Sequence, residues 1–145
     1  MTPVQASEQG DDATRGTRGW HSVTLPDTPL PKGAYSPGVR AGDFVFVSGQ
    51  VPRDPRTGEL VGDEIAEQTR QVLRNLAGVL AASGAAITDV VSVTVYLANV
   101  DDWGTFDAAY RETFSAPFPT RTALGASLRG ILVEISAVAY VGGGA

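Results

Sequence analysis

The chain has 145 residues, enough for one domain that buries a core without disulfides or metals. It contains no cysteine, which excludes disulfide frameworks, thiolate metal sites, iron-sulfur clusters and cysteine nucleophiles. The formal net charge is -5 and no cluster of Lys and Arg occurs, which argues against a nucleic-acid partner because phosphate neutralisation requires concentrated positive charge.

Two other reactive residue types are almost absent. His21 is the only histidine and Lys32 is the only lysine. A zinc site would therefore need carboxylates for nearly every ligand, and a Schiff-base enzyme would depend on a lysine that directly follows Pro31. We expect neither kind of site.

Residues 1–18 carry almost no large apolar side chain, so we expect a flexible tail, followed by one folded domain over residues 19–145. No run approaches the roughly 18 to 20 apolar residues of a membrane span, and the polar N-terminus does not resemble a signal peptide. We therefore expect a cytoplasmic protein with no membrane partner.

The first strands are predicted by apolar and aromatic runs. Trp20, Val23 and Leu25 are spaced as in a short edge strand, which two prolines then end. A second run, FVFVSGQ, ends in Ser48 and Gly49. Gly49 would let a ligand approach the backbone, with the Ser48 hydroxyl beside it, although an ordinary strand end or bulge is the better explanation if no other feature matches.

A helix is predicted after Asp63, which is suited to cap it, and Gly84 ends it. Its apolar residues keep helical spacing, which indicates one face packed on a sheet. They are Ile65, Val72, Leu73, Leu76, Val79 and Leu80. The polar face comprises Glu67, Gln68, Arg70, Gln71, Arg74 and Asn75 and shows no sign of a site.

Residues 90–97 alternate as a strand does, with Val91, Val93, Val95 and Leu97 on one face. The opposite face is neither apolar nor charged throughout, which suits a subunit contact or a ligand-lined surface. A second helix is predicted after Asp101 or Asp102. Its aromatic stripe of Trp103, Phe106, Tyr110 and Phe114 is most simply core.

The segment FPTRT, residues 118–122, carries the best candidate for binding an anion. The planar guanidinium of Arg121 matches a carboxylate and stays charged at all relevant pH values. Taken on its own, the residue is better explained as a solvated surface arginine.

The tail of the chain reads as two strands around Arg129 and Gly130, and a two-residue link between such runs predicts a hairpin. Glu134 lies in the apolar second strand, where a carboxylate is costly unless it has a partner. A functional site and a structural salt bridge are equally good explanations. Counted back from the turn, Arg121 and Glu134 would share a face roughly 13 Å apart, a gap that fits a small carboxylate and a water beside another subunit.

Over residues 31–141 the chain resembles the RidA/YjgF/L-PSP family of enamine and imine deaminases. The matching segments are AYSPGVRAGDFVFVSGQVPRDPRTGELVG, IAEQTRQVLRNLAGVLAASG, DVVSVTVYLANVDDW, FPTRT and LVEISAVAY. The resemblance implies an α+β fold, with a single mixed or antiparallel sheet and two helices packed on one face. It also implies a homotrimer whose sheets line a central barrel, with ligand pockets between subunits.

The reaction that the resemblance implies is hydrolysis of 2-enamine or 2-imine acids, such as 2-aminoacrylate or 2-iminobutyrate, to 2-keto acids and ammonia, with no cofactor or metal. By position, Arg121 would bind the substrate carboxylate and Glu134 would orient or activate the water. Tyr35 would enter from across the interface. Ser48 and Gly49 would lie beside the substrate, and the backbone of Ala123 would help to hold the water or the imine nitrogen.

Two residues depart from the family pattern. Asp107 stands where well-studied members carry asparagine, which would add a negative charge beside the bound ligand, and Ala123 stands where they carry cysteine. Two alternative functions therefore stay open: a non-catalytic trimeric binder of small carboxylates, and a tailoring enzyme that acts on a larger imine. A ribonuclease is disfavoured by the acidic charge and by the lack of a histidine pair.

Overall fold

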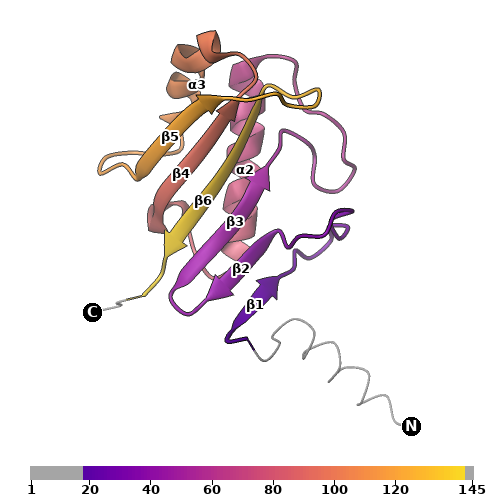
Figure 1. Ribbon diagram of the computed structural model, residues 1–145, viewed down its shortest axis with the longest axis vertical. Coiled ribbons are helices and arrows are strands. Elements are labelled where there is room, and N and C mark those ends of the chain that lie inside the picture. The colour runs from indigo at the N-terminus through magenta and orange to yellow at the C-terminus, as the bar shows by residue number, and fades with distance from the viewer. Residues whose placement is uncertain (1–17, 143–145) are drawn as a thin grey trace.

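A computed structural model describes residues 18–142. Six strands form one mixed sheet in the order β1-β2-β3-β6-β4-β5, and both helices cover one of its faces (Figure 1). The strands are β1 (Trp20–Val23), β2 (Gly38–Ala41), β3 (Phe44–Gln50), β4 (Val90–Leu97), β5 (Thr120–Gly125) and β6 (Val133–Tyr140). The helices are α2 (Ile65–Ala82) and α3 (Trp103–Tyr110). The predicted α+β class is confirmed, while the predicted tail, except for its last residue, lies outside the described residues.

Helix α2 packs its predicted apolar face on the sheet, and all six of the residues expected there are buried. The helix begins after Glu64 rather than Asp63, and Glu64 makes no side-chain cap bond. It ends before Gly84, whose positive φ of +81° is the left-handed conformation that commonly follows a helix.

Gln68 belongs to the polar face predicted for α2, yet it is buried. Its side chain is only 2% exposed. The amide nitrogen donates to the Gly62 carbonyl at 3.1 Å, and the amide oxygen accepts from the Leu132 N–H at 2.8 Å. Gln68 therefore satisfies two loop backbone groups from inside the core.

The predicted hairpin between the last two strands is wrong. β5 pairs with β4 in parallel, and α3 lies in the connection between these two strands. β6 pairs antiparallel with both β4 and β3, so β4 separates it from β5. Gly130 does sit in a turn with φ +69°, but residues 126–132 carry the chain past β4 instead of folding it back on β5.

The two faces of the sheet differ sharply. Val45, Val93, Val95, Leu97, Val133 and Ile135 point toward the helices and are almost fully buried. A register shift between Val90 and Ser92 turns Val91 outward, so Val91 is 44% exposed where the alternation predicted it to be buried. No helix within residues 18–142 is both long and apolar enough to cross a membrane.

The face opposite the helices carries exposed aromatic side chains. Phe44, Phe46 and Tyr140 are 42%, 47% and 41% exposed. Phe44 lies between the other two, with ring centroids 6.5 Å from Phe46 and 5.2 Å from Tyr140. Such a cluster on a monomer surface is typical of an interface.

Candidate functional site

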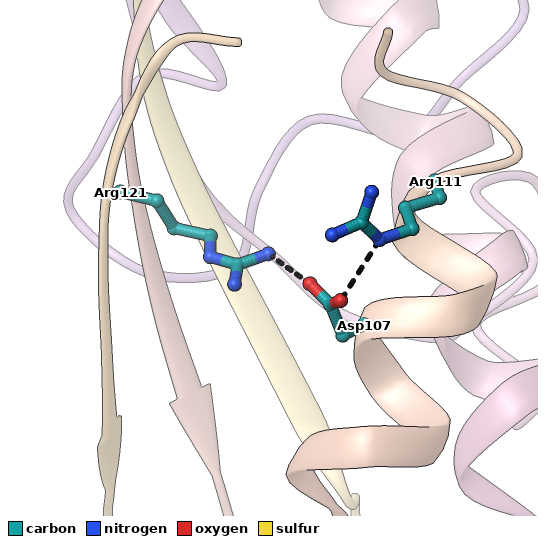
Figure 2. Close-up of polar contacts among 3 residues, drawn as sticks. All are labelled: Asp107, Arg111 and Arg121. Carbon is teal, nitrogen blue, oxygen red and sulfur yellow. Dashed lines mark hydrogen bonds and ion pairs between the residues drawn. The ribbon is translucent and has the colours of Figure 1, made fainter. Parts of the chain in front are cut away.

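Arg121 lies near the start of the edge strand β5, and it pairs in register with Val93 of β4. Because Val93 faces the helices, the side chain of Arg121 extends on the same side, toward α3. One terminal nitrogen donates a hydrogen bond to Asp107 Oδ1 at 2.8 Å, an ion pair drawn in Figure 2. Arg121 is therefore a positioned, partly buried side chain rather than a solvated surface arginine.

Three aromatic rings surround the Arg121 guanidinium. Its central carbon lies 4.7 Å from the ring centroid of Tyr110, 5.4 Å from Trp103 and 5.6 Å from Phe106. These cation-π contacts hold the group in place, and only 20% of the side chain is exposed. Within residues 18–142, its N–H groups donate to no side chain other than Asp107, which leaves donors for an incoming anion.

Asp107 is shared between two arginines. Its other oxygen accepts a hydrogen bond from Arg111 Nε at 3.0 Å, one helical turn further along (Figure 2). The hydrogen bond from Arg121 lowers the pKa of the Asp107 carboxyl below its ordinary value, and the Arg111 bond acts in the same direction, against the opposing effect of burial. Asp107 is therefore ionised at neutral pH.

A pocket of about 270 Å³ opens beside these charges. Its lining combines both arginines and Asp107 with apolar surface from Tyr110, Phe118 and Pro119. The Arg111 guanidinium carbon also lies 5.5 Å from the Phe118 ring centroid. The sequence reasoning missed Arg111, although its position four residues after Asp107 on a predicted helix was a usable signal.

Tyr110 combines a buried ring with an unsatisfied hydroxyl. Its ring stacks on Phe114 with centroids 4.5 Å apart, which agrees with the predicted core role. Its hydroxyl oxygen is buried and has no hydrogen-bond partner in the described part of the chain. Burial raises the pKa of this hydroxyl above its ordinary value, although the nearby positive charge of Arg121 opposes the shift. Tyr110 therefore stays neutral.

A second group of predicted site residues lies around the end of β3. Gly49 is so close to Glu134 that a Cβ added at Gly49 would overlap the Glu134 carboxylate. The Ser48 hydroxyl donates to the Ser36 carbonyl at 2.6 Å, so it holds the segment after Tyr35 against the strand. Tyr35 itself is 60% exposed.

A larger pocket, of about 430 Å³, borders this second group. Tyr35, Gly49 and Gln50 line it together with the loops of residues 24–37 and 51–58. Asn75 of α2 fixes one wall, because its amide donates to the Val51 and Arg53 carbonyls at 2.9 and 2.8 Å.

The prediction that Arg121 and Glu134 share a face is wrong. Arg121 aligns with Val93 and Ala137 on the helix side, whereas Glu134 aligns with Tyr96 and faces the opposite side. Their backbones are two strands and three positions apart, roughly 14 Å. Ala123 lies with Arg121 on β5, partly buried against the core. The predicted residues thus form two groups: Arg121, Asp107 and Ala123 in one, and Tyr35, Ser48, Gly49 and Glu134 in the other.

The fold and the first group define a small α+β protein with a positively charged pocket on the helix side of its edge strand. The profile of the family described as Endoribonuclease L-PSP matches residues 26–141. The chain belongs to this family, which is also known as RidA/YjgF/L-PSP, as its sequence segments predicted.

Individual relatives agree with this assignment. The chain is 43% identical over 116 residues to RutC family protein PH0854 of Pyrococcus horikoshii, covering 79% of this chain and 92% of that one. It is 38% identical over 122 residues to the 2-iminobutanoate/2-iminopropanoate deaminase of Homo sapiens, covering 83% and 89%. The crystal structure of YyfA from Yersinia pestis, of the conserved Rid protein family, matches with a TM-score of 0.79 at 32% identity, covering 84% and 99%.

Proposed function

We propose that the protein hydrolyses small 2-imino acids, and the enamines in equilibrium with them, to 2-keto acids and ammonia. A water oxygen bonds to the imine carbon, the carbon-nitrogen bond breaks, and the nitrogen leaves as ammonia after taking up protons. Support comes from the similarity to a protein named 2-iminobutanoate/2-iminopropanoate deaminase. The substrate carries one carboxylate beside a short apolar group, the chemistry that the pocket at Arg121 fits.

The observation that carries the proposal is the fixed guanidinium of Arg121. Three aromatic rings and Asp107 hold it at a pocket of about 270 Å³, with donors left for a ligand. A carboxylate bound there would accept charge-assisted hydrogen bonds from the Arg121 guanidinium. Phe118 and Pro119 would contact the substrate side chain.

The second group would supply the chemistry. In this proposal Glu134 orients the attacking water, while Ser48, Gly49 and Tyr35 shape its surroundings, and the Ala123 backbone on the edge strand assists. Because Glu134 and Arg121 lie on opposite faces of one chain, the complete site would form between two subunits of a homotrimer. The exposed aromatic cluster of Phe44, Phe46 and Tyr140 supports such an assembly.

The test is turnover of 2-iminobutyrate, generated in the assay, by wild type and by Arg121→Ala. Losing a charged hydrogen-bond partner costs about 1.5–3 kcal/mol, so we expect kcat/KM to fall about 10- to 100-fold. Arg74→Ala is the matched control, because Arg74 is exposed on α2 and bonds only Gln71 among the described residues. Equal rates for wild type and Arg121→Ala would refute the proposal.

A non-catalytic binder of small carboxylates is the second candidate. The observation that favours it is that Asp107 already occupies part of the Arg121 fork, while Glu134 lies roughly 14 Å away in the same chain. Saturable binding of a 2-keto acid at Arg121, with no turnover above buffer, would identify this function.

A further inference from the structure

We propose that Asp107 and Arg111 together set the charge that the Arg121 pocket accepts, so that it selects monocarboxylates over dicarboxylates. The inference rests on the proposed ligand class, a small 2-keto or 2-imino acid. It adds Asp107 and Arg111, as residues that determine specificity, to the carboxylate binding proposed for Arg121.

The argument begins with the charges at the pocket. Arg121 and Arg111 are cationic and Asp107 is anionic, so the three side chains carry one net positive charge. All three line the pocket. A ligand with one carboxylate neutralises the group, whereas a second carboxylate adds an uncompensated negative charge beside Asp107.

Asp107 alone would oppose anion binding. Its carboxylate lies 2.8 Å from the nitrogen of Arg121 that it binds, so a ligand carboxylate on the same guanidinium would approach a like charge. In a pair of only Asp107 and Arg121, the two charges would cancel. Arg111 restores the positive charge through its own bond to the second oxygen of Asp107, at 3.0 Å.

The geometry allows Arg111 to act this way. Figure 2 shows the Arg121 guanidinium, from β5, and the Arg111 guanidinium, from the residue that follows α3, each bonded to a different oxygen of the Asp107 carboxylate. The Arg111 side chain is 63% exposed, so it remains accessible to a ligand, and its guanidinium carbon lies over the Phe118 ring, 5.5 Å from the centroid. Arg111 engages Asp107 through Nε, which leaves its terminal nitrogens without a side-chain partner in the described range.

Two substitutions change the net charge of these three side chains in opposite directions. Asp107→Asn keeps the shape of the side chain but raises the net charge of the group by one. Arg111→Gln lowers it by one. Glu112→Gln is the matched control for the first, because Glu112 lies five residues after Asp107 but pairs with Arg70 on the surface. Arg74→Gln is the matched control for the second.

The experiment measures dissociation constants of 2-oxobutyrate and 2-oxoglutarate by NMR titration of the full-length protein, followed at the Trp103 indole N–H. The wild type should bind 2-oxobutyrate more tightly. We expect Asp107→Asn to strengthen 2-oxoglutarate binding about 10-fold and to change 2-oxobutyrate binding less, which corresponds to about 1.4 kcal/mol of added attraction for the second carboxylate. Arg111→Gln should weaken the binding of both ligands about 5-fold. In the double variant of Asp107→Asn and Arg111→Gln, the loss of 2-oxobutyrate affinity caused by Arg111→Gln should be smaller.

An unchanged ratio of the two affinities in Asp107→Asn would overturn the inference, as would an equal shift in Glu112→Gln. If Asp107→Asn does not fold, the Arg111→Gln variant tests the inference instead. An affinity for 2-oxobutyrate in Arg111→Gln equal to that of wild type would also overturn it. Imine turnover is measured separately. Charge-selective binding without turnover refutes the deaminase proposal alone, and turnover without charge selectivity refutes this inference alone.

Discussion

Arg121 and Glu134 lie on opposite faces of the same sheet, two strands apart, so no single ligand in one subunit bridges them. If the proposed site forms between subunits, each cleft takes Arg121 from one chain and Glu134 from another. The two residues of one cleft can therefore be altered in separate chains.

Subunit mixing tests this arrangement. Arg121→Ala and Glu134→Gln should each abolish most deaminase activity as pure trimers. When the two variants are co-expressed, about a third of the clefts in trimers that contain both variants would receive an intact residue from each side. We expect activity to return in the mixture, measured on purified oligomers carrying two different affinity tags. If the mixed trimers are no more active than the pure variants, Arg121 and Glu134 of each cleft come from the same subunit.

Substitution of Gly49 should act through Glu134. The added methyl group of Gly49→Ala would overlap the Glu134 carboxylate and displace it. We expect kcat to fall about 10-fold with KM little changed, because carboxylate binding at Arg121 is untouched. Gly78→Ala is the control. Gly78 is exposed on α2 with no atom near its added Cβ, so it should leave kcat intact and stabilise the fold by about 0.5–1 kcal/mol.

The ion pair of Asp107 should contribute to stability in a defined pH range. The folded-state pKa of Asp107 is lowered from 3.8, so its stabilising effect is present above that value and is lost as pH falls below it. We expect the melting temperature of wild type to exceed that of Asp107→Asn by a constant amount between about pH 5 and 8. The difference should shrink below about pH 4. A difference that persists or grows in acid would contradict this assignment.

Removal of the Tyr110 hydroxyl should stabilise the protein. Tyr110 buries an oxygen that has no partner in the described residues, and an unsatisfied polar group costs about 1–3 kcal/mol. Tyr110→Phe keeps the stacked ring and removes that cost, so we expect the unfolding free energy to rise by about 1 kcal/mol. Denaturant titration measures this change. A clear loss of stability would mean that the hydroxyl has a partner in the assembled protein.

The elements of the fold were predictable from local patterns. Residues 90–97 alternate in apolarity, and the apolar residues of α2 keep helical spacing along its length. The ends of both elements, β4 and α2, were therefore predicted to within a residue or two. The resemblance then supplied the arrangement of helices on one face. These signals depend on which side of an element is apolar, and that information is present in a single sequence.

Strand order was not predictable in the same way. Period-two alternation says which face of β5 is buried, but nothing about which strand lies beside it, so the turn at Gly130 was wrongly taken as a hairpin. Val91 and Gln68 show the same limit. A register shift between Val90 and Ser92 exposes Val91, and Gln68 is buried where it accepts a hydrogen bond from a backbone N–H 64 residues away. The pairing of Arg121 with Asp107 likewise depends on the crossover through α3.

Among the strands within residues 18–142, β6 comes last in sequence, yet it holds a central place in the sheet. In that range it alone hydrogen-bonds both to the meander of β1, β2 and β3 and to the pair of β4 and β5. During synthesis, the earlier strands therefore lack the partner that joins them until residues 133–140 have left the ribosome. Folding of this domain is consequently expected to be governed by contacts between segments far apart in sequence.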